Sequence, residues 1–282
     1  MNNFEQAIKQ AIIEYFEQKD IGYVDDSFNS IFHQYMNILD KYIQPKPYTV
    51  KISSQLQEKM KESTELSEKI NYFKSLFQSG NDVHGHQSRH IYRAEFYDKL
   101  LMLWNIHHLH LNCTEANTDD EMRHNRSDTL LFVLVKDDKV YFIDIESHNK
   151  DHVFSMFRLL EIIQDNWEYL LFKQKDVVDI SFIADDSMLE TLFKGNLNYY
   201  IFKIKDSFYS VGINTQTMAG TSINNQLAYG DLQAFLRRIY PEPPICPTNI
   251  KCVLHYSKSY FCDLEWNEGN RPKRYTIVLK KY

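Results

Sequence analysis

The sequence predicts an α+β protein in which helices pack on antiparallel sheets. Two segments near the start carry apolar residues at helical spacing, which is typical of amphipathic helices. The middle of the chain combines short apolar strands with further helices, and the last third continues that mixture without an internal repeat. With 43% hydrophobic residues over 282 positions, the chain can bury a core as one large domain or two to three small ones.

Residues 1–45 predict a helical hairpin without evident chemistry. Its apolar residues recur at helical spacing on either side of a cap signal at Asp25-Asp26-Ser27. Residues 176–282 predict a C-terminal α+β module of short strands and two helices. We interpret both segments as regions for packing, or for binding a partner or target.

Residues 46–175 form the predicted core. A strand at 48–52 precedes two helices over 53–79, the second of which Gly80 should end. Asp137-Asp138 is a tight-turn signal, so the strands on either side of it should pair as an antiparallel hairpin. Three strands are expected at 106–112, 128–135 and 139–146, with a short helix before them over 94–104 and a long amphipathic helix after them over 152–172.

The net charge of −6 is unevenly distributed. Residues 46–172 carry a net charge of −5, and residues 173–282 carry +3. A protein that binds nucleic acid mainly by neutralising phosphates should be basic. The charge therefore disfavours extensive phosphate contacts by the core.

Neither a membrane segment nor a secretion signal is evident. No apolar run approaches the length of a membrane span, and MNNFEQAIKQ lacks the features of a signal peptide. We therefore expect a cytoplasmic protein without a membrane partner. The four cysteines form no CxxC pair and are expected to be reduced thiols. Zinc binding by Cys246, Cys252, His255 and Cys262 is an alternative, although their spacing matches no common module.

Alternation along the strands orients the candidate site residues. Leu109 and Leu111 should face the core, so His108 and His110 should project from the opposite face of the strand. On the last strand of the core, alternation places Phe142, Asp144 and Glu146 together on one side.

Most of the eleven histidines lie near strand ends or in the preceding loop. His148 lies just beyond one strand end, and Asp128 opens the neighbouring strand. We expect His110, Asp128 and His148 to converge at one end of the sheet. A further histidine, His84 or His86, should come from the loop after the second helix.

These residue types suit acid–base cleavage of RNA. A histidine can remove a proton from a ribose 2′-hydroxyl, and another can protonate the leaving 5′-oxygen. A nearby carboxylate orients an imidazole, and arginine suits a phosphate that gathers charge. Such a site needs no metal or other cofactor. The candidates for substrate contacts are Arg123, Arg126, Arg89 and His108. In the competing interpretation, each histidine is an ordinary surface or capping residue.

The order of elements and the strand-end residues resemble the RelE/YafQ-type toxin superfamily of small mRNA-cleaving ribonucleases. The similarity covers about 125 residues, within 48–172, and includes IHHLHL and RSDTLLFVLVKDDKVYFIDIESHNKDHVF. It implies a RelE-like fold, with His110, Asp128 and His148 as catalytic residues and His84 or His86 as the loop histidine. The family's strand arginine aligns near Asp144, so Arg123 or Arg126 would have to replace it.

Two other functions stay open. The motif DIESHNK loosely resembles a PD-(D/E)xK nuclease, in which Asp128, Asp144 and Glu146 would bind Mg²⁺, but His148 stands where lysine is usual. The chain could also be a non-catalytic interaction protein on a toxin-like scaffold. The leading hypothesis is a toxin-like, metal-independent endoribonuclease, a defence or growth-arrest effector. Its expected partners are RNA, including mRNA on the ribosome, and an antitoxin or regulatory protein.

Overall fold

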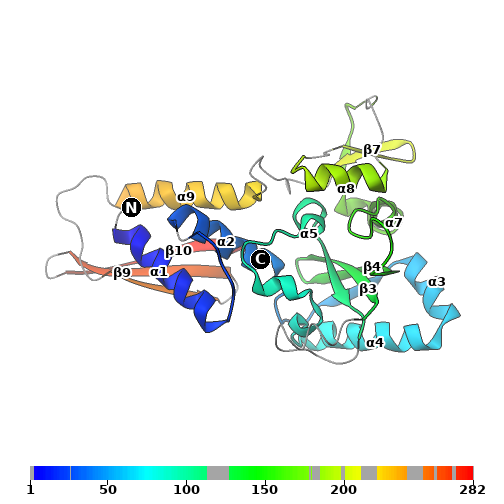
Figure 1. Ribbon diagram of the computed structural model, residues 1–282, viewed down its shortest axis with the longest axis horizontal. Helices are drawn as coiled ribbons and strands as arrows, with labels where there is room; N and C mark the ends of the chain where they lie inside the picture. The colour runs from blue at the N-terminus through cyan, green and yellow to red at the C-terminus, as the bar shows by residue number, and fades with distance from the viewer. Residues whose placement is uncertain are drawn as a thin grey trace. The chain divides into compact units, whose positions relative to one another are not determined.

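The computed structural model has the predicted α+β class, with helices packed on sheets. It describes residues 3–25, 27–112, 127–177, 179, 185–197, 201–210, 221–239, 250–256, 259–268 and 271–281. The chain forms two compact units (Figure 1). Unit 1 comprises Met1–Asp40, Tyr92–Phe96 and Ile223–Tyr282, and unit 2 comprises Lys41–Ile91 and Tyr97–Ser222.

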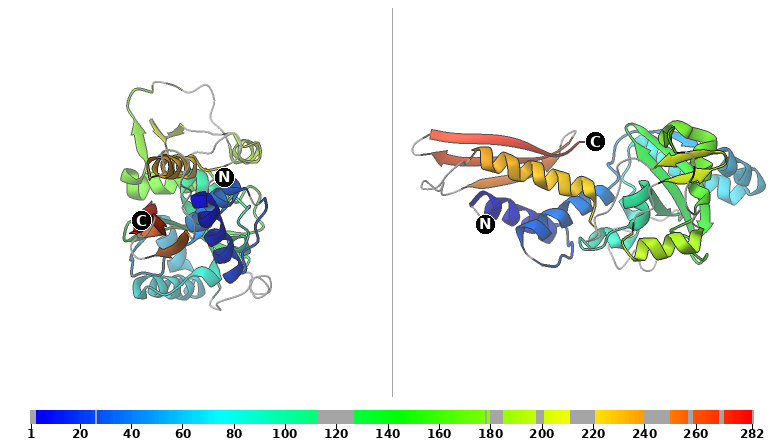
Figure 2. Two further views of the ribbon diagram at one scale, coloured as in Figure 1. Left: turned by 90° about the vertical axis from the view of Figure 1, so that its left-hand side faces the viewer. Right: turned by 90° about the horizontal axis from the view of Figure 1, so that it is seen from above.

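Unit 1 joins segments that are far apart in the sequence. Helices α1 (Asn3–Gln18), α2 (Phe28–Lys41) and α9 (Ile223–Ile239) lie along one face of an antiparallel sheet (Figure 2). The strands of that sheet run in the order β10 (Arg271–Lys281), β9 (Ser259–Glu268), β8 (Lys251–Tyr256).

One hydrophobic core unites these elements. It contains Phe4 and Ile8 of α1 together with Leu264 and Trp266 of β9. The side chain of Asn37 on α2 adds the segment 92–96, because it donates hydrogen bonds of 2.8 Å to the carbonyls of Ala94 and Phe96. The two predicted helices of residues 1–45 are present, but they pack with C-terminal strands. The partition therefore differs from the three consecutive segments 1–45, 46–175 and 176–282.

A carboxylate is held on the other face of the unit 1 sheet. Asp263 accepts hydrogen bonds from the Thr276 hydroxyl at 2.6 Å and from Arg274 Nη2 at 2.8 Å, and His255 Nε2 lies 3.2 Å away. The hydrogen bonds from Thr276 and Arg274, with His255 nearby, lower the pKa of Asp263 from 3.8 to about 2. Asp263 should therefore stabilise unit 1 only while it is ionised.

We expect Asp263→Asn to destabilise unit 1 at pH 7 by about 1–2 kcal/mol. This loss is smaller than the pKa shift alone would imply, because Arg274 is largely exposed and water screens its charge. Since folding lowers the pKa of Asp263, its contribution is fully present above pH 3.8 and is lost as the pH falls through about 2. Hydrogen exchange of the β8–β10 amides at several pH values would measure the difference for this unit alone. Asp231→Asn, at an exposed position on α9, is the control, and a difference as large at pH 2 as at pH 7 would contradict the assignment.

Unit 2 is built on a four-stranded sheet with the order β1 (Thr49–Ile52), β4 (Lys139–Ser147), β3 (Thr129–Lys136), β2 (Ile106–His110). The pairs β2–β3 and β3–β4 are antiparallel, as predicted. Strand β1 instead runs parallel to β4, with Thr49 opposite Lys139. A parallel neighbour requires a crossover, and the helices that follow β1 begin it.

Helices cover both faces of this sheet (Figure 1). Helices α3 (Ser54–Glu62) and α4 (Thr64–Ser79) pack on the face that contains Leu109 and Phe142. Helices α5 (Lys99–Trp104) and α7 (Arg158–Trp167) pack on the face that contains Ile106 and Phe132. The sheet is therefore the central layer of unit 2.

A second, smaller sheet completes unit 2. Its strands run in the order β5 (Phe172–Gln174), β7 (Ser207–Ser210), β6 (Phe202–Ile204). Helix α8 (Asp186–Lys194) lies between β5 and β6 in the chain, and the short 3-10 helices are η1 (His84–His86), η2 (Arg89–Tyr92) and η3 (Glu168–Leu170). The sequence also predicts a strand at 178–184, which lies almost entirely outside the described residues.

Two predicted helices begin later than expected. Helix α5 begins at Lys99, because the carboxylate of Asp98 caps it by accepting a hydrogen bond from the Leu101 amide. Helix α7 begins at Arg158, since Asp186 of α8 accepts a hydrogen bond from the Phe157 amide at 2.7 Å and fixes the chain before the helix. Within the described ranges, no helix combines the length and apolar character needed to cross a bilayer.

A β-bulge changes which side chains share a face of β4. Phe132 pairs with Asp144, but the next residue, Val133, pairs with Phe142. The expectation that Phe142, Asp144 and Glu146 share one side is therefore wrong. Phe142 packs under α4, whereas Asp144 and Glu146 belong to the face covered by α5 and α7.

Candidate functional site

Two histidines and two carboxylates occupy one face of the unit 2 sheet. His110 lies opposite Leu130, which lies opposite Glu146. His108 lies opposite Phe132, which lies opposite Asp144. The carboxylates are therefore about 10 Å from the histidines, on the other side of the apolar strand β3. The predicted alternation of His108 and His110 with Leu109 and Leu111 is present in β2.

His110 and His148 form a pair of imidazoles at the end of this face. Their ring centroids are 5.8 Å apart, and the ring planes differ by 19°. The His110 Nδ1 lies 3.2 Å from the Ser127 carbonyl oxygen, and the His110 side chain is almost completely buried. The ring of Phe154 contacts His148 and His108, with centroid distances of 5.7 and 5.0 Å. Two imidazoles thus contact one aromatic side chain, and the third, His110, stacks on His148.

Asp128 lies next to this pair through its backbone. The His148 amide donates a 2.6 Å hydrogen bond to the Asp128 carbonyl, which extends the β3–β4 ladder by one residue. The Asp128 side chain is exposed. The structure thus brings the three predicted catalytic residues together, although the Asp128 contact with His148 is made by the main chain.

The loop histidines have different surroundings. His86 is fully buried, its Nδ1 lies 3.1 Å from Asn112 Oδ1, and its ring packs on Phe73 at 4.7 Å. This burial and packing favour a structural role for His86. His84 is partly exposed and packs on the ring of Tyr42 at 5.3 Å.

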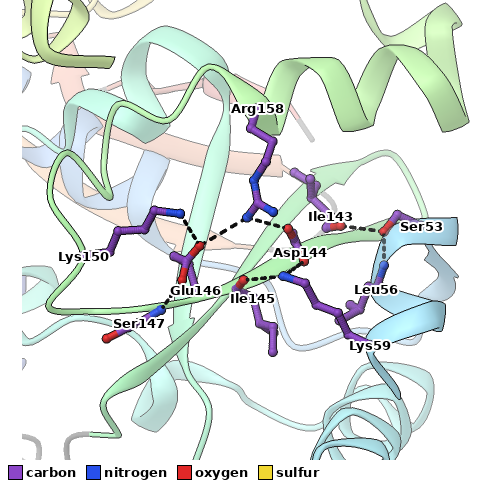
Figure 3. Close-up of polar contacts among 10 residues, drawn as sticks. All are labelled: Ser53, Leu56, Lys59, Ile143, Asp144, Ile145, Glu146, Ser147, Lys150 and Arg158. Atoms are coloured by element: carbon purple, nitrogen blue, oxygen red, sulfur yellow. Dashed lines mark hydrogen bonds and ion pairs between the residues drawn. The ribbon is translucent and has the colours of Figure 1, made fainter. Parts of the chain in front are cut away.

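The predicted arginines add little to this geometry. Arg123 and Arg126 lie outside the described residues, and Arg89 is a partly exposed residue of η2. Sequence reasoning missed the cations that do reach the sheet. These are Lys59 of α3, Lys150 of the loop after β4, and Arg158 at the start of α7 (Figure 3).

Asp144 is the buried centre of this charged cluster. Its side chain is 0% exposed and forms ion pairs with Lys59 Nζ at 2.8 Å and with Arg158 Nη2 at 2.7 Å. Lys59 also donates to the Ile145 carbonyl at 3.1 Å. Two cations therefore compensate one carboxylate in a region of low dielectric constant.

Ser53 fixes the position of Lys59. Its hydroxyl donates a 2.6 Å hydrogen bond to the Ile143 carbonyl and accepts a 3.0 Å bond from the Leu56 amide at the start of α3. The same side chain therefore caps α3 and holds that helix to β4. As a result, the next turns of α3 place Lys59 beside Asp144 (Figure 3).

Glu146 lies between the charged cluster and the imidazole pair along β4. It accepts a 2.6 Å hydrogen bond from Lys150, and Arg158 Nη2 lies 3.4 Å away. Partial burial disfavours its ionised form, but the hydrogen bonds from Lys150 and the Ser147 amide, with the Arg158 charge, hold the pKa of Glu146 below its usual value. Arg158 therefore connects both carboxylates of this face.

The predicted metal sites are not supported by this arrangement. Both oxygens of Asp144 face cations, and no group of three or more His, Cys, Asp or Glu residues in the described part of the chain is arranged to hold a metal ion. In the proposed zinc set, Cys252 and Cys262 are neighbours, whereas His255 pairs with Asp263 on the opposite face of the sheet, and Cys246 lies outside the described residues.

Comparisons with known proteins provide no relative. No protein-family model matches the chain, and no curated protein or solved structure matches it. The resemblance to the RelE/YafQ superfamily therefore stays a prediction.

Proposed function

We propose that the chain is a toxin-like, metal-independent endoribonuclease in which His110 and His148 provide the general acid and the general base. The observation that carries this proposal is the pair of imidazoles 5.8 Å apart at the end of the sheet. Groups at that separation can contact two oxygens of one phosphodiester. Arg158 and Lys150 belong to the same end of the sheet and supply positive charge.

In the proposed reaction, one imidazole removes the proton of a ribose 2′-hydroxyl. The 2′-oxygen attacks the adjacent phosphorus, and the bond to the 5′-oxygen of the next nucleotide breaks. The second imidazole, as imidazolium, gives its proton to that leaving oxygen. The products are a 2′,3′-cyclic phosphate and a 5′-hydroxyl, and the proposed reaction requires no metal or other cofactor.

Arg158 replaces the strand arginine that the family resemblance requires. In this proposal its guanidinium stabilises the charge that gathers on the phosphate. The pairing with Asp144 and Glu146 leaves the side chain 40% exposed, so one side of it remains accessible. The net charge of −5 over residues 46–172 favours free RNA over ribosome-bound mRNA as the substrate. An antitoxin or another regulatory protein remains the expected partner.

The test compares wild type with the double variant His110→Ala/His148→Ala. We expect wild type to cleave single-stranded RNA in the presence of a chelator, to leave 2′,3′-cyclic phosphate ends, and to arrest growth when expressed. The double variant should do none of these. His152→Asn is the matched control, because His152 belongs to the same loop but pairs with Glu190 and has a positive φ of 57° that asparagine tolerates.

Each other outcome identifies a different function. Cleavage that a chelator abolishes would favour the metal-dependent nuclease. A growth phenotype that persists in the double variant, without any RNA cleavage, would favour the non-catalytic interaction protein. Equal growth of all strains, with no cleavage by wild type, would contradict the proposal.

A further inference from the structure

Two cysteine sulfurs meet inside unit 1. Cys252 of β8 and Cys262 of β9 are both free, and their Sγ atoms are 3.1 Å apart. In the strand register, Cys252 lies opposite Leu264 and Cys262 lies opposite Leu254, so the two cysteines are diagonal neighbours across the strand pair. Both side chains belong to the face that packs on α1, α2 and α9.

We propose that Cys252 and Cys262 form a redox-active dithiol that low-molecular-weight disulfides oxidise to a cross-strand disulfide. The sulfurs need to approach by about 1 Å to reach the bonded distance of about 2.05 Å. Because the two Sγ atoms are already 3.1 Å apart, small rotations of the two side chains bring them to this distance. The site is independent of the proposed ribonuclease activity, because it lies in the other unit.

The two thiols differ in access, which sets the order of the reaction. Cys262 is completely buried in the central strand of its sheet. Cys252 is partly exposed and belongs to the edge strand β8, so a soluble oxidant reaches it first. The hydrogen bond to Cys252 and burial raise the pKa of Cys262, so this thiol remains protonated until the second step.

The chemistry balances with a disulfide such as oxidised glutathione. The Cys252 thiolate attacks one glutathione sulfur, forms a mixed disulfide and releases one glutathione thiolate. Cys262 then loses its proton, attacks the Cys252 sulfur and releases the second glutathione. The protein loses two hydrogen atoms and two electrons, and the oxidant becomes two molecules of reduced glutathione.

The test uses the full chain with Cys113→Ser and Cys246→Ser, so that only the two thiols of the pair remain. We expect oxidised glutathione to remove both free thiols from the folded protein, with a mass decrease of two hydrogen atoms. Because the bond closes a short loop between β8 and β9, the melting temperature of unit 1 should rise by roughly 5–10 °C.

Two further variants in that background make the result decisive. Cys262→Ala should stop at the glutathione adduct on Cys252, and Cys252→Ser should remain unmodified while folded. A glutathione adduct that persists in the protein with both thiols would overturn the proposal. So would disulfide formation that occurs only in denaturant.

Discussion

Asparagine in place of Asp144 will lower the free energy of unfolding of unit 2 by about 3 kcal/mol. The substitution leaves Lys59 and Arg158 beside a neutral amide in a site that is 0% exposed. The expected loss is at the low end of the range for a broken buried ion pair. The reason is that the two cations are 34% and 40% exposed and can turn toward water.

The measurement is urea denaturation followed by tryptophan fluorescence. The chain has three tryptophans, and a Trp266→Phe background leaves only Trp104 and Trp167, both in unit 2. Asp138→Asn is the matched control, because that exposed carboxylate also pairs with a lysine, Lys46. The control should unfold like its parent.

A triple variant separates unpaired charge from lost packing. Lys59→Met/Asp144→Leu/Arg158→Met replaces the whole cluster by apolar side chains, and we expect it to recover most of the lost stability. An Asp144→Asn protein as stable as its parent would contradict the assignment of Asp144 as the buried centre. A triple variant with a lower free energy of unfolding than Asp144→Asn would show that the ion pairs stabilise unit 2 more than the apolar side chains do.

The second large effect concerns the imidazole pair. We expect His110→Ala and His148→Ala each to reduce RNA cleavage by about 10²–10⁴-fold, as removal of a general acid or base does. The double variant should lose little more than either single variant, because both groups act in one transition state. These proteins form a double-mutant cycle of wild type, the two single variants and the double variant. The four cleavage rates are measured as initial rates on a fluorogenic RNA, with each protein at equal concentration.

The dependence of rate on pH provides a control for this cycle. Wild-type cleavage should pass through a maximum, and each single variant should lose one of the two limbs. Losses that multiply in the double variant would mean that the histidines act independently. Full activity of both single variants would place the chemistry elsewhere.

Local patterns predicted much of unit 2. Gly80 ends α4 in the left-handed conformation, with a φ of 75°, as a helix-ending glycine should. Asp137 has a φ of 55° in the turn between β3 and β4, which agrees with the predicted hairpin. Alternation placed His108 and His110 on one face, and the pairing of strand ends placed His148 beside Asp128.

The failures arise where distant segments decide the structure. One extra residue at the β4 bulge reverses the face of Asp144 relative to Phe142, and no local signal specifies it. A lone acid within the apolar run VYFIDI could have indicated a buried ion pair. It could not identify Lys59, 85 positions earlier in the chain, or Arg158 as the partners.

The composition of unit 1 has a consequence for synthesis on the ribosome. Helices α1 and α2 are made before unit 2, but the strands that cover their apolar faces are made after it. At a synthesis rate of ~5–20 residues per second, roughly 10–50 s pass between the synthesis of these helices and that of β8, β9 and β10. Unit 2 has left the ribosome by then, so we expect it to fold first. The apolar faces of α1 and α2 are accessible to chaperones during that interval.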